Sequence, residues 1–148
     1  MDACRYDGEK IDAPWLKKLV SKADLISVCP EIEIGLGKPR KLINLIKDED
    51  GVRVIQSETG LDLNEELASF SEGYLRFVGE IDAFVLKSKS PSCGIGTTKI
   101  QQKDGSGRLG SGVFATLAMK LFPSAIFVDE SFMEENGVDA LLDLINQP

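Results

Sequence analysis

The chain has 148 residues, 43% apolar and 28% charged, a composition that excludes a disordered polymer and suits a single soluble domain over residues 1–148. The net charge of −7 argues against general electrostatic binding to nucleic acid. The absence of histidine excludes Ser-His and Cys-His catalysis and histidine-bound zinc. Because no run is long enough to cross a bilayer and no signal peptide is recognisable, we expect no membrane contact and a cytoplasmic location.

In the N-terminal half, Asp12 can cap a helix, and the apolar residues after it recur at helical spacing. A short apolar run then leads to Cys29. Two β-like runs flank the turn signal Asp48-Glu49-Asp50-Gly51. Asp62 and Glu65 form a capping box ahead of an apolar stripe. The predicted elements are a helix from Asp12, a buried strand over 23–28, a hairpin of 42–46 with 52–56, and a helix over 62–78.

In the C-terminal half, helical and extended patterns alternate again. The predicted elements are strands over 83–86, 97–102 and 125–128, a glycine-rich segment over 105–112, a helix from Ser111 that Pro123 ends, and a helix over 132–145 broken at Asn136-Gly137. Alternating strands and helices predict an α/β fold: a three-layer sandwich with a mostly parallel sheet, Rossmann-like in arrangement.

The three cysteines, Cys4, Cys29 and Cys93, each lie beside proline, arginine or glycine rather than inside a helix stripe. Cys29 and Cys93 follow predicted strands, and ligands in open α/β sheets gather at the carboxyl ends of strands. Thiolates suit iron–sulfur clusters, and three of them would leave the fourth iron of a cubane open as a Lewis acid. A free cysteine is also often only a small buried apolar residue, and that alternative is open for each thiol.

A second pattern, Gly105-x-Gly107-x-x-Gly110, opens a predicted helix, and the next strand ends at Asp129. This copies the dinucleotide fingerprint in form, including the acidic residue that binds a ribose hydroxyl. The polar residues 101–104 stand where a buried strand should run into the first glycine. We therefore favour a loop and a helix N-terminus over a cofactor site, and a nucleotide-binding module using Gly105 to Gly112 stays the alternative.

Three motifs in one order carry a family resemblance: Cys-Arg-Tyr-Asp-Gly at 4–8, Val-Cys-Pro-Glu at 28–31 followed by Gly-Leu-Gly-Lys-Pro-Arg, and Leu-Lys-Ser-Lys-Ser-Pro-Ser-Cys-Gly at 86–94. Together they resemble the bacterial family called domain of unknown function 523, which includes the thiouracil desulfidases. The resemblance covers nearly the whole chain.

The resemblance implies a [4Fe-4S] cluster held by three cysteines, whose open iron takes the sulfur of a thiolated pyrimidine or similar small thiocarbonyl compound while water replaces that sulfur. Carried onto this chain, Cys29 and Cys93 match cluster ligands, Glu31 matches a residue for proton transfer, and Ser90 matches one that orients substrate or water. The remaining candidates are Ser92, Arg40 and Asp7 for substrate binding and Cys4 as a substitute third ligand.

One departure from the family pattern concerns its first strand and Ser-x-Cys-Leu motif, which we expect to be absent here. Losing a central strand would leave part of the sheet unpaired, which favours pairing between copies and therefore a homodimer. The expected function is thiouracil desulfidase-like chemistry. A family member without a cluster or activity is the other alternative.

Overall fold

The computed structural model describes residues 13–37, 39–49, 51–102 and 104–147. The helices are α1 (Trp15–Lys22), α2 (Pro30–Glu33), α3 (Asn64–Phe77), α4 (Val113–Leu121) and α5 (Glu130–Ile145). The strands are β1 (Ile43–Asp48), β2 (Gly51–Gln56), β3 (Ala83–Leu86), β4 (Thr98–Gln102), β5 (Gly107–Gly110) and β6 (Ile126–Asp129). None of the helices in these ranges has the length and apolarity to span a membrane.

The strands form two sheets rather than one. A four-stranded sheet has the order β2-β1-β4-β5, and β3 pairs with β6 in a separate two-stranded sheet. The β1–β4 and β3–β6 pairs are parallel, but β1–β2 and β4–β5 are antiparallel. The α/β class is confirmed, whereas the mostly parallel sheet is confirmed only in part, because short turns join β1 to β2 and β4 to β5 and force antiparallel pairing.

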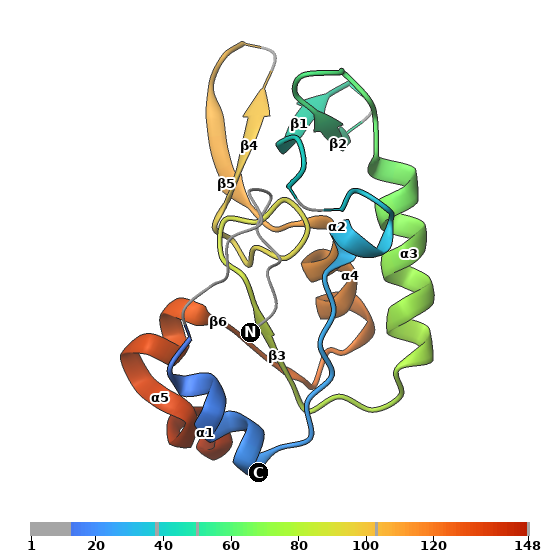
Figure 1. Cartoon of the computed structure of the whole chain (residues 1–148). Coiled ribbons are helices and arrows are strands. Elements are labelled where there is room, and N and C mark those ends of the chain that lie inside the picture. Colours follow the sequence, from blue (N-terminus) through green and yellow to red (C-terminus); the bar gives the residue numbers. More distant parts are fainter. Residues whose placement is uncertain (1–12, 38, 50, 103, 148) are drawn as a thin grey trace.

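Helices cover both faces of the β3–β6 sheet. On one face Met133 and Leu141 of α5 pack with Leu19 of α1, and on the other Phe114 of α4 packs with Leu75 of α3. The four-stranded sheet packs against the start of α3 through side chains that are fully buried, Leu45, Val54 and Leu67. In Figure 1 the four-stranded sheet lies at the top and the β3–β6 sheet in the lower half, with α2 and the loop after β3 between them.

Most predicted elements are present, including the hairpin and the break in the last helix, where Gly137 has φ 82°. The predicted strand over 23–28 is wrong: this stretch has no strand assignment, and Leu25 and Ile26 are 45% and 62% exposed. An apolar run becomes a strand only where a neighbour completes its hydrogen bonds, and no described strand pairs with it. The capping residue Asp12 lies outside the described residues.

Candidate functional site

The loop over residues 87–97, here called the Cys93 loop, continues directly from β3. The Ser90 hydroxyl accepts hydrogen bonds from the backbone N–H groups of Ser92 at 3.2 Å and Cys93 at 3.0 Å. The N–H of Gly94 donates to the Ser90 carbonyl at 2.9 Å, and the buried Thr98 hydroxyl donates to the same oxygen at 2.6 Å. Ser90 therefore closes a tight turn that presents the Cys93 thiol.

The Cys93 loop also rests on the N-terminus of α4. The N–H groups of Gly112, Val113 and Ala115 donate to the carbonyls of Gly94 at 2.8 Å, Pro91 at 3.1 Å and Ser92 at 3.0 Å. These contacts satisfy N–H groups that a helix start otherwise leaves free. The packing is close, because a Cβ added at Gly112 would lie 2.3 Å from the backbone carbon of Ser92.

The glycine-rich segment does not have the conformation that the dinucleotide alternative requires. Gly107–Gly110 forms β5, which pairs antiparallel with β4 instead of making a phosphate-binding turn. Since the N–H groups of Gly112, Val113 and Ala115 already bind loop carbonyls, they are not available to a pyrophosphate. The segment supports the Cys93 loop rather than a nucleotide.

Cys29 immediately precedes α2, where Pro30 occupies the first helical position. This short helix carries Glu31 into the interior, where the residue is only 8% exposed. Arg40, whose side chain is 4% exposed, donates from Nε to Glu31 Oε1 at 3.1 Å and from Nη1 to the Gly37 carbonyl at 2.9 Å. A buried carboxylate needs such a partner, so Arg40 holds Glu31 in place.

A polar contact joins the Cys93 loop to α2. The Ser92 hydroxyl, buried with the residue 1% exposed, donates to Glu31 Oε2 at 2.9 Å. The Ser90 hydroxyl lies 3.0 Å from the Ser92 oxygen, and the Cys93 sulfur lies 3.6 Å from it. A continuous chain of hydrogen bonds therefore runs from Ser90 through Ser92 to the Glu31 carboxylate.

Cys29 and Cys93 are both partly buried, and neither is in a disulfide. Burial raises the pKa of Cys93 to about 12; the Ser92 hydroxyl opposes the rise, and the nearby Glu31 carboxylate and Cys29 thiol add to it. Cys29 is therefore close enough to act on Cys93 electrostatically. A thiolate at Cys93 would require a cationic partner such as a metal centre.

The structure thus brings together four of the predicted residues, Cys29, Glu31, Ser90 and Ser92, beside Cys93. Arg40 is present too, but as the partner of Glu31. Cys4 and Asp7 lie outside the described residues, and within the described ranges no three thiol or carboxylate side chains form a metal-binding group.

Two residues that hold the Cys93 loop escaped the sequence analysis. Thr98 binds the Ser90 carbonyl, and Glu130 binds Lys87 and Ser88 at the start of the loop. The available signal for Glu130 was the acidic pair Asp129-Glu130 that follows the last predicted strand. Its partner could be found only from the pairing of β3 with β6.

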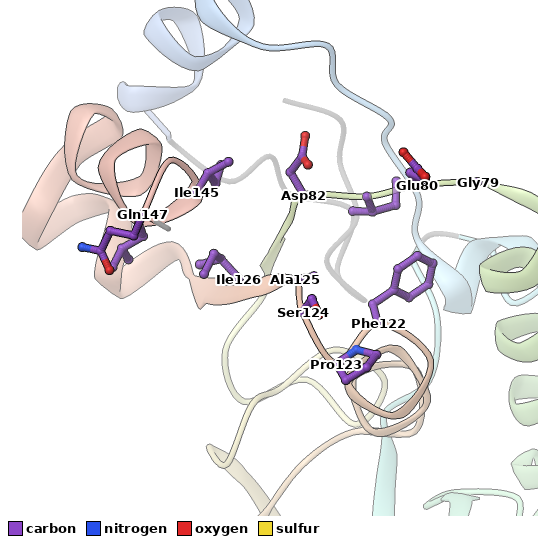
Figure 2. Close-up of a pocket in the computed structure, with 12 residues that line it drawn as sticks. Gly79, Glu80, Asp82, Phe122, Pro123, Ser124, Ala125, Ile126, Ile145 and Gln147 are labelled. Atoms are coloured by element: carbon purple, nitrogen blue, oxygen red, sulfur yellow. The ribbon is translucent and has the colours of Figure 1, made fainter.

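An open pocket of about 440 Å³ lies elsewhere, at the amino ends of β3 and β6. Figure 2 shows Glu80, Asp82, Phe122 and Ile145 around it. None of the predicted site residues lines this pocket, and ligands of α/β sheets bind at the opposite, carboxyl ends of the strands. We therefore place the candidate site at the Cys93 loop.

Comparison with known proteins agrees with the motifs at this site. The family model for 2-thiouracil desulfurase matches residues 1–130. The chain belongs to this family. We therefore interpret the two thiols, Glu31, Ser90 and Ser92 by comparison with members of this family.

Two known proteins are similar to this chain over most of their length. An uncharacterized protein of Bacillus subtilis (strain 168), YbbK, is 33% identical over 121 residues, 77% of this chain and 80% of the relative. The solved structure of the [4Fe-4S]-dependent thiouracil desulfidase TudS is 28% identical, with a TM-score of 0.67 and 95% of each chain covered. The overall arrangement of helices and strands is thus shared with a thiouracil desulfidase.

Proposed function

We propose that the protein is a thiouracil desulfidase-like enzyme that converts the C=S group of a thiolated pyrimidine or similar small thiocarbonyl compound to C=O, releasing sulfide. One observation carries the proposal: the Ser92 to Glu31 hydrogen bond joins the Val-Cys-Pro-Glu and Ser-Pro-Ser-Cys-Gly motifs at one place, with a thiol on each side. Family membership and the similarity to TudS support it.

A [4Fe-4S] cluster fits the residues present as far as they are described. Neither Cys29 nor Cys93 is in a disulfide, Cys29 acts electrostatically on Cys93, and thiolates are the usual ligands of such clusters. They would supply two ligands, with Cys4 proposed as the third. When bound, the cluster would supply an iron that acts as a Lewis acid toward the thiocarbonyl sulfur.

We assign Glu31 to proton transfer, because its Oε2 atom accepts the Ser92 proton and that hydroxyl continues to Ser90. The net reaction consumes one water and yields hydrogen sulfide, so protons must leave the attacking water and reach the departing sulfur. Ser90 and Ser92 are proposed to orient substrate and water. Arg40 holds the carboxylate, and Asp7 stays a proposed substrate contact.

The test is sulfide release and uracil formation from 2-thiouracil by anaerobically reconstituted protein. Glu31→Gln should lower the rate at least about 100-fold while keeping the cluster. Glu33→Gln, two residues along the same helix and exposed, is the matched control and should stay within about twofold of the unmodified protein. A loaded cluster with no sulfide release from any thiolated pyrimidine would reject the proposal.

A further inference from the structure

Glu130, which the proposed reaction does not use, binds the start of the Cys93 loop. It is the first residue of α5, and its side chain is 14% exposed. Oε1 accepts from Lys87 Nζ at 2.6 Å and from Ser88 Oγ at 2.5 Å, and Oε2 accepts from the backbone N–H of Ser88 at 2.7 Å. One carboxylate therefore fixes the ammonium, hydroxyl and backbone groups of two successive residues.

Strand register explains this placement. β3 and β6 are parallel, and Leu86 of β3 is paired with Asp129 of β6. The residues that follow each strand consequently leave the sheet side by side, so Glu130 meets Lys87 and Ser88. Since Ser88 is buried, its N–H and hydroxyl could not be satisfied by water if Glu130 were removed.

The charge state of Glu130 suits this role. Burial raises the pKa of Glu130, but hydrogen bonds from the Lys87 ammonium, the Ser88 hydroxyl and the Ser88 N–H outweigh it and hold the pKa below the ordinary glutamate value. The side chain is therefore an anion at neutral pH. Its negative charge also neutralises Lys87, the first residue of the loop.

The next residue of the loop has an unfavourable backbone conformation. Lys89 has φ 62° and is the only non-glycine residue with positive φ among the described residues. Its N–H donates to the Thr97 hydroxyl at 2.9 Å. Side-chain-bearing residues keep such a conformation only where their surroundings impose it, and Ser88 is the neighbour that Glu130 immobilises.

We propose that Glu130 is a positioning residue for the site: by fixing Lys87 and Ser88 it imposes the turn at Lys89 and so determines where the Cys93 thiol and the Ser92 hydroxyl lie relative to Glu31. The geometric part of this proposal depends on the β3–β6 register and on the hydrogen bonds of Glu130, not on the proposed function. Its catalytic consequence rests on the proposed function.

The experiment measures the alkylation rate of each cysteine in the full-length, cluster-free protein with iodoacetamide, resolved by peptide mass spectrometry. Glu130→Ala should raise the Cys93 rate about fivefold or more, because the loop opens more often. The Cys29 rate should stay within about twofold. Glu134→Ala, an exposed glutamate on the same helix, is the matched control and should change neither rate.

Ser88→Ala, which removes one of the three hydrogen bonds, should give a smaller rise confined to Cys93, and it tests the proposal even where Glu130→Ala does not fold. An unchanged Cys93 rate in either variant would overturn the proposal. So would an equal rise at Cys29 and Cys93 with a lower melting temperature, since that pattern indicates general loosening. A wild-type protein that releases no sulfide would refute the proposed function but leave this thiol measurement decisive for Glu130.

Discussion

The segments that carry the two thiols of the candidate site are held in place to very different extents. Cys93 lies in a loop that is bonded to Glu130 at its start, to Thr98 within its turn and to the first N–H groups of α4 along its backbone. Cys29 follows an extended stretch, residues 23–28, that joins no described sheet and exposes Leu25 and Ile26. The Cys93 side of the site is therefore held by hydrogen bonds along the whole loop. The Cys29 side is held only by contacts of the residues that follow Cys29.

The difference indicates where the site depends on single contacts. The Cys93 loop has many bonds, so losing one should shift it locally. The Cys29 side is tied to it through Glu31, which is held by Arg40 and bonded to Ser92. Substitutions that act on this connection should therefore have larger effects than substitutions in the exposed stretch before Cys29.

Arg40→Met should have the largest effect, because it leaves the buried Glu31 carboxylate without its cation. We expect a loss of about 3–5 kcal/mol in the free energy of unfolding, measured with urea at neutral pH. Lys41→Met, which breaks the exposed pair with Glu58, is the control and should cost less than about 0.5 kcal/mol. Equal losses in the two variants would show that Glu31 is not held as described.

Gly112→Ala tests the contact between the Cys93 loop and α4. Gly112 has φ −68°, which alanine adopts readily, so the expected loss of about 1–3 kcal/mol comes from collision with the Ser92 backbone. Gly73→Ala, at an exposed position of α3, meets no atom within 4 Å and should instead raise stability by about 0.5–1 kcal/mol. A tolerated alanine at residue 112 would contradict the close packing.

Glu130→Gln tests the support at the other end of the loop through its pH dependence. Because the folded pKa of Glu130 lies below the unfolded value of about 4.3, its stabilisation is present above that pH and is lost as the pH falls through the folded pKa. The variant should be about 1–2 kcal/mol less stable at pH 7 and should approach the unmodified protein in acid. Urea unfolding at both pH values measures the difference, and a gap that persists unchanged in acid would rule out the charged interaction.

Ile26→Ser should have the smallest effect if the stretch before Cys29 is unpaired. An exposed side chain outside the described sheets should change the free energy of unfolding by less than about 0.5 kcal/mol. Leu45→Ala, at a fully buried position of β1, should cost about 2–5 kcal/mol by the same measurement. A large loss in the free energy of unfolding for Ile26→Ser would mean that Ile26 is buried in solution. The segment before Cys29 would then be held as firmly as the Cys93 loop.

Local signals in the sequence were sufficient for much of this architecture. The Asp-Gly turn gave the hairpin, and Asn136-Gly137 gave the break in α5, because both features depend on neighbouring residues. Strand pairing was less predictable: 23–28 has a strand pattern but no partner, whereas Gly107–Gly110 has a loop composition and pairs through its backbone. Pairing depends on residues distant in the chain.

The same distinction applies to the site. Cys93 was found because it follows an apolar run beside proline and glycine, whereas Ser90 and Glu31 were assigned from the family resemblance of the motifs around the cysteines. The bonds between them could not be predicted, since Ser92 and Glu31 are 61 residues apart. Glu130 lies 43 residues from Lys87 and becomes part of the site only through the β3–β6 register.

The central claim is that Cys29 and Cys93 bind one metal centre, and iron and sulfide content after anaerobic reconstitution tests it most directly. The unmodified protein should reach about four irons and four sulfides per chain. Cys29→Ser and Cys93→Ser should each lose as much iron as the double variant, because a cluster that needs both ligands is lost with either. Single variants that retain wild-type iron, or losses that simply add in the double variant, would contradict a shared centre.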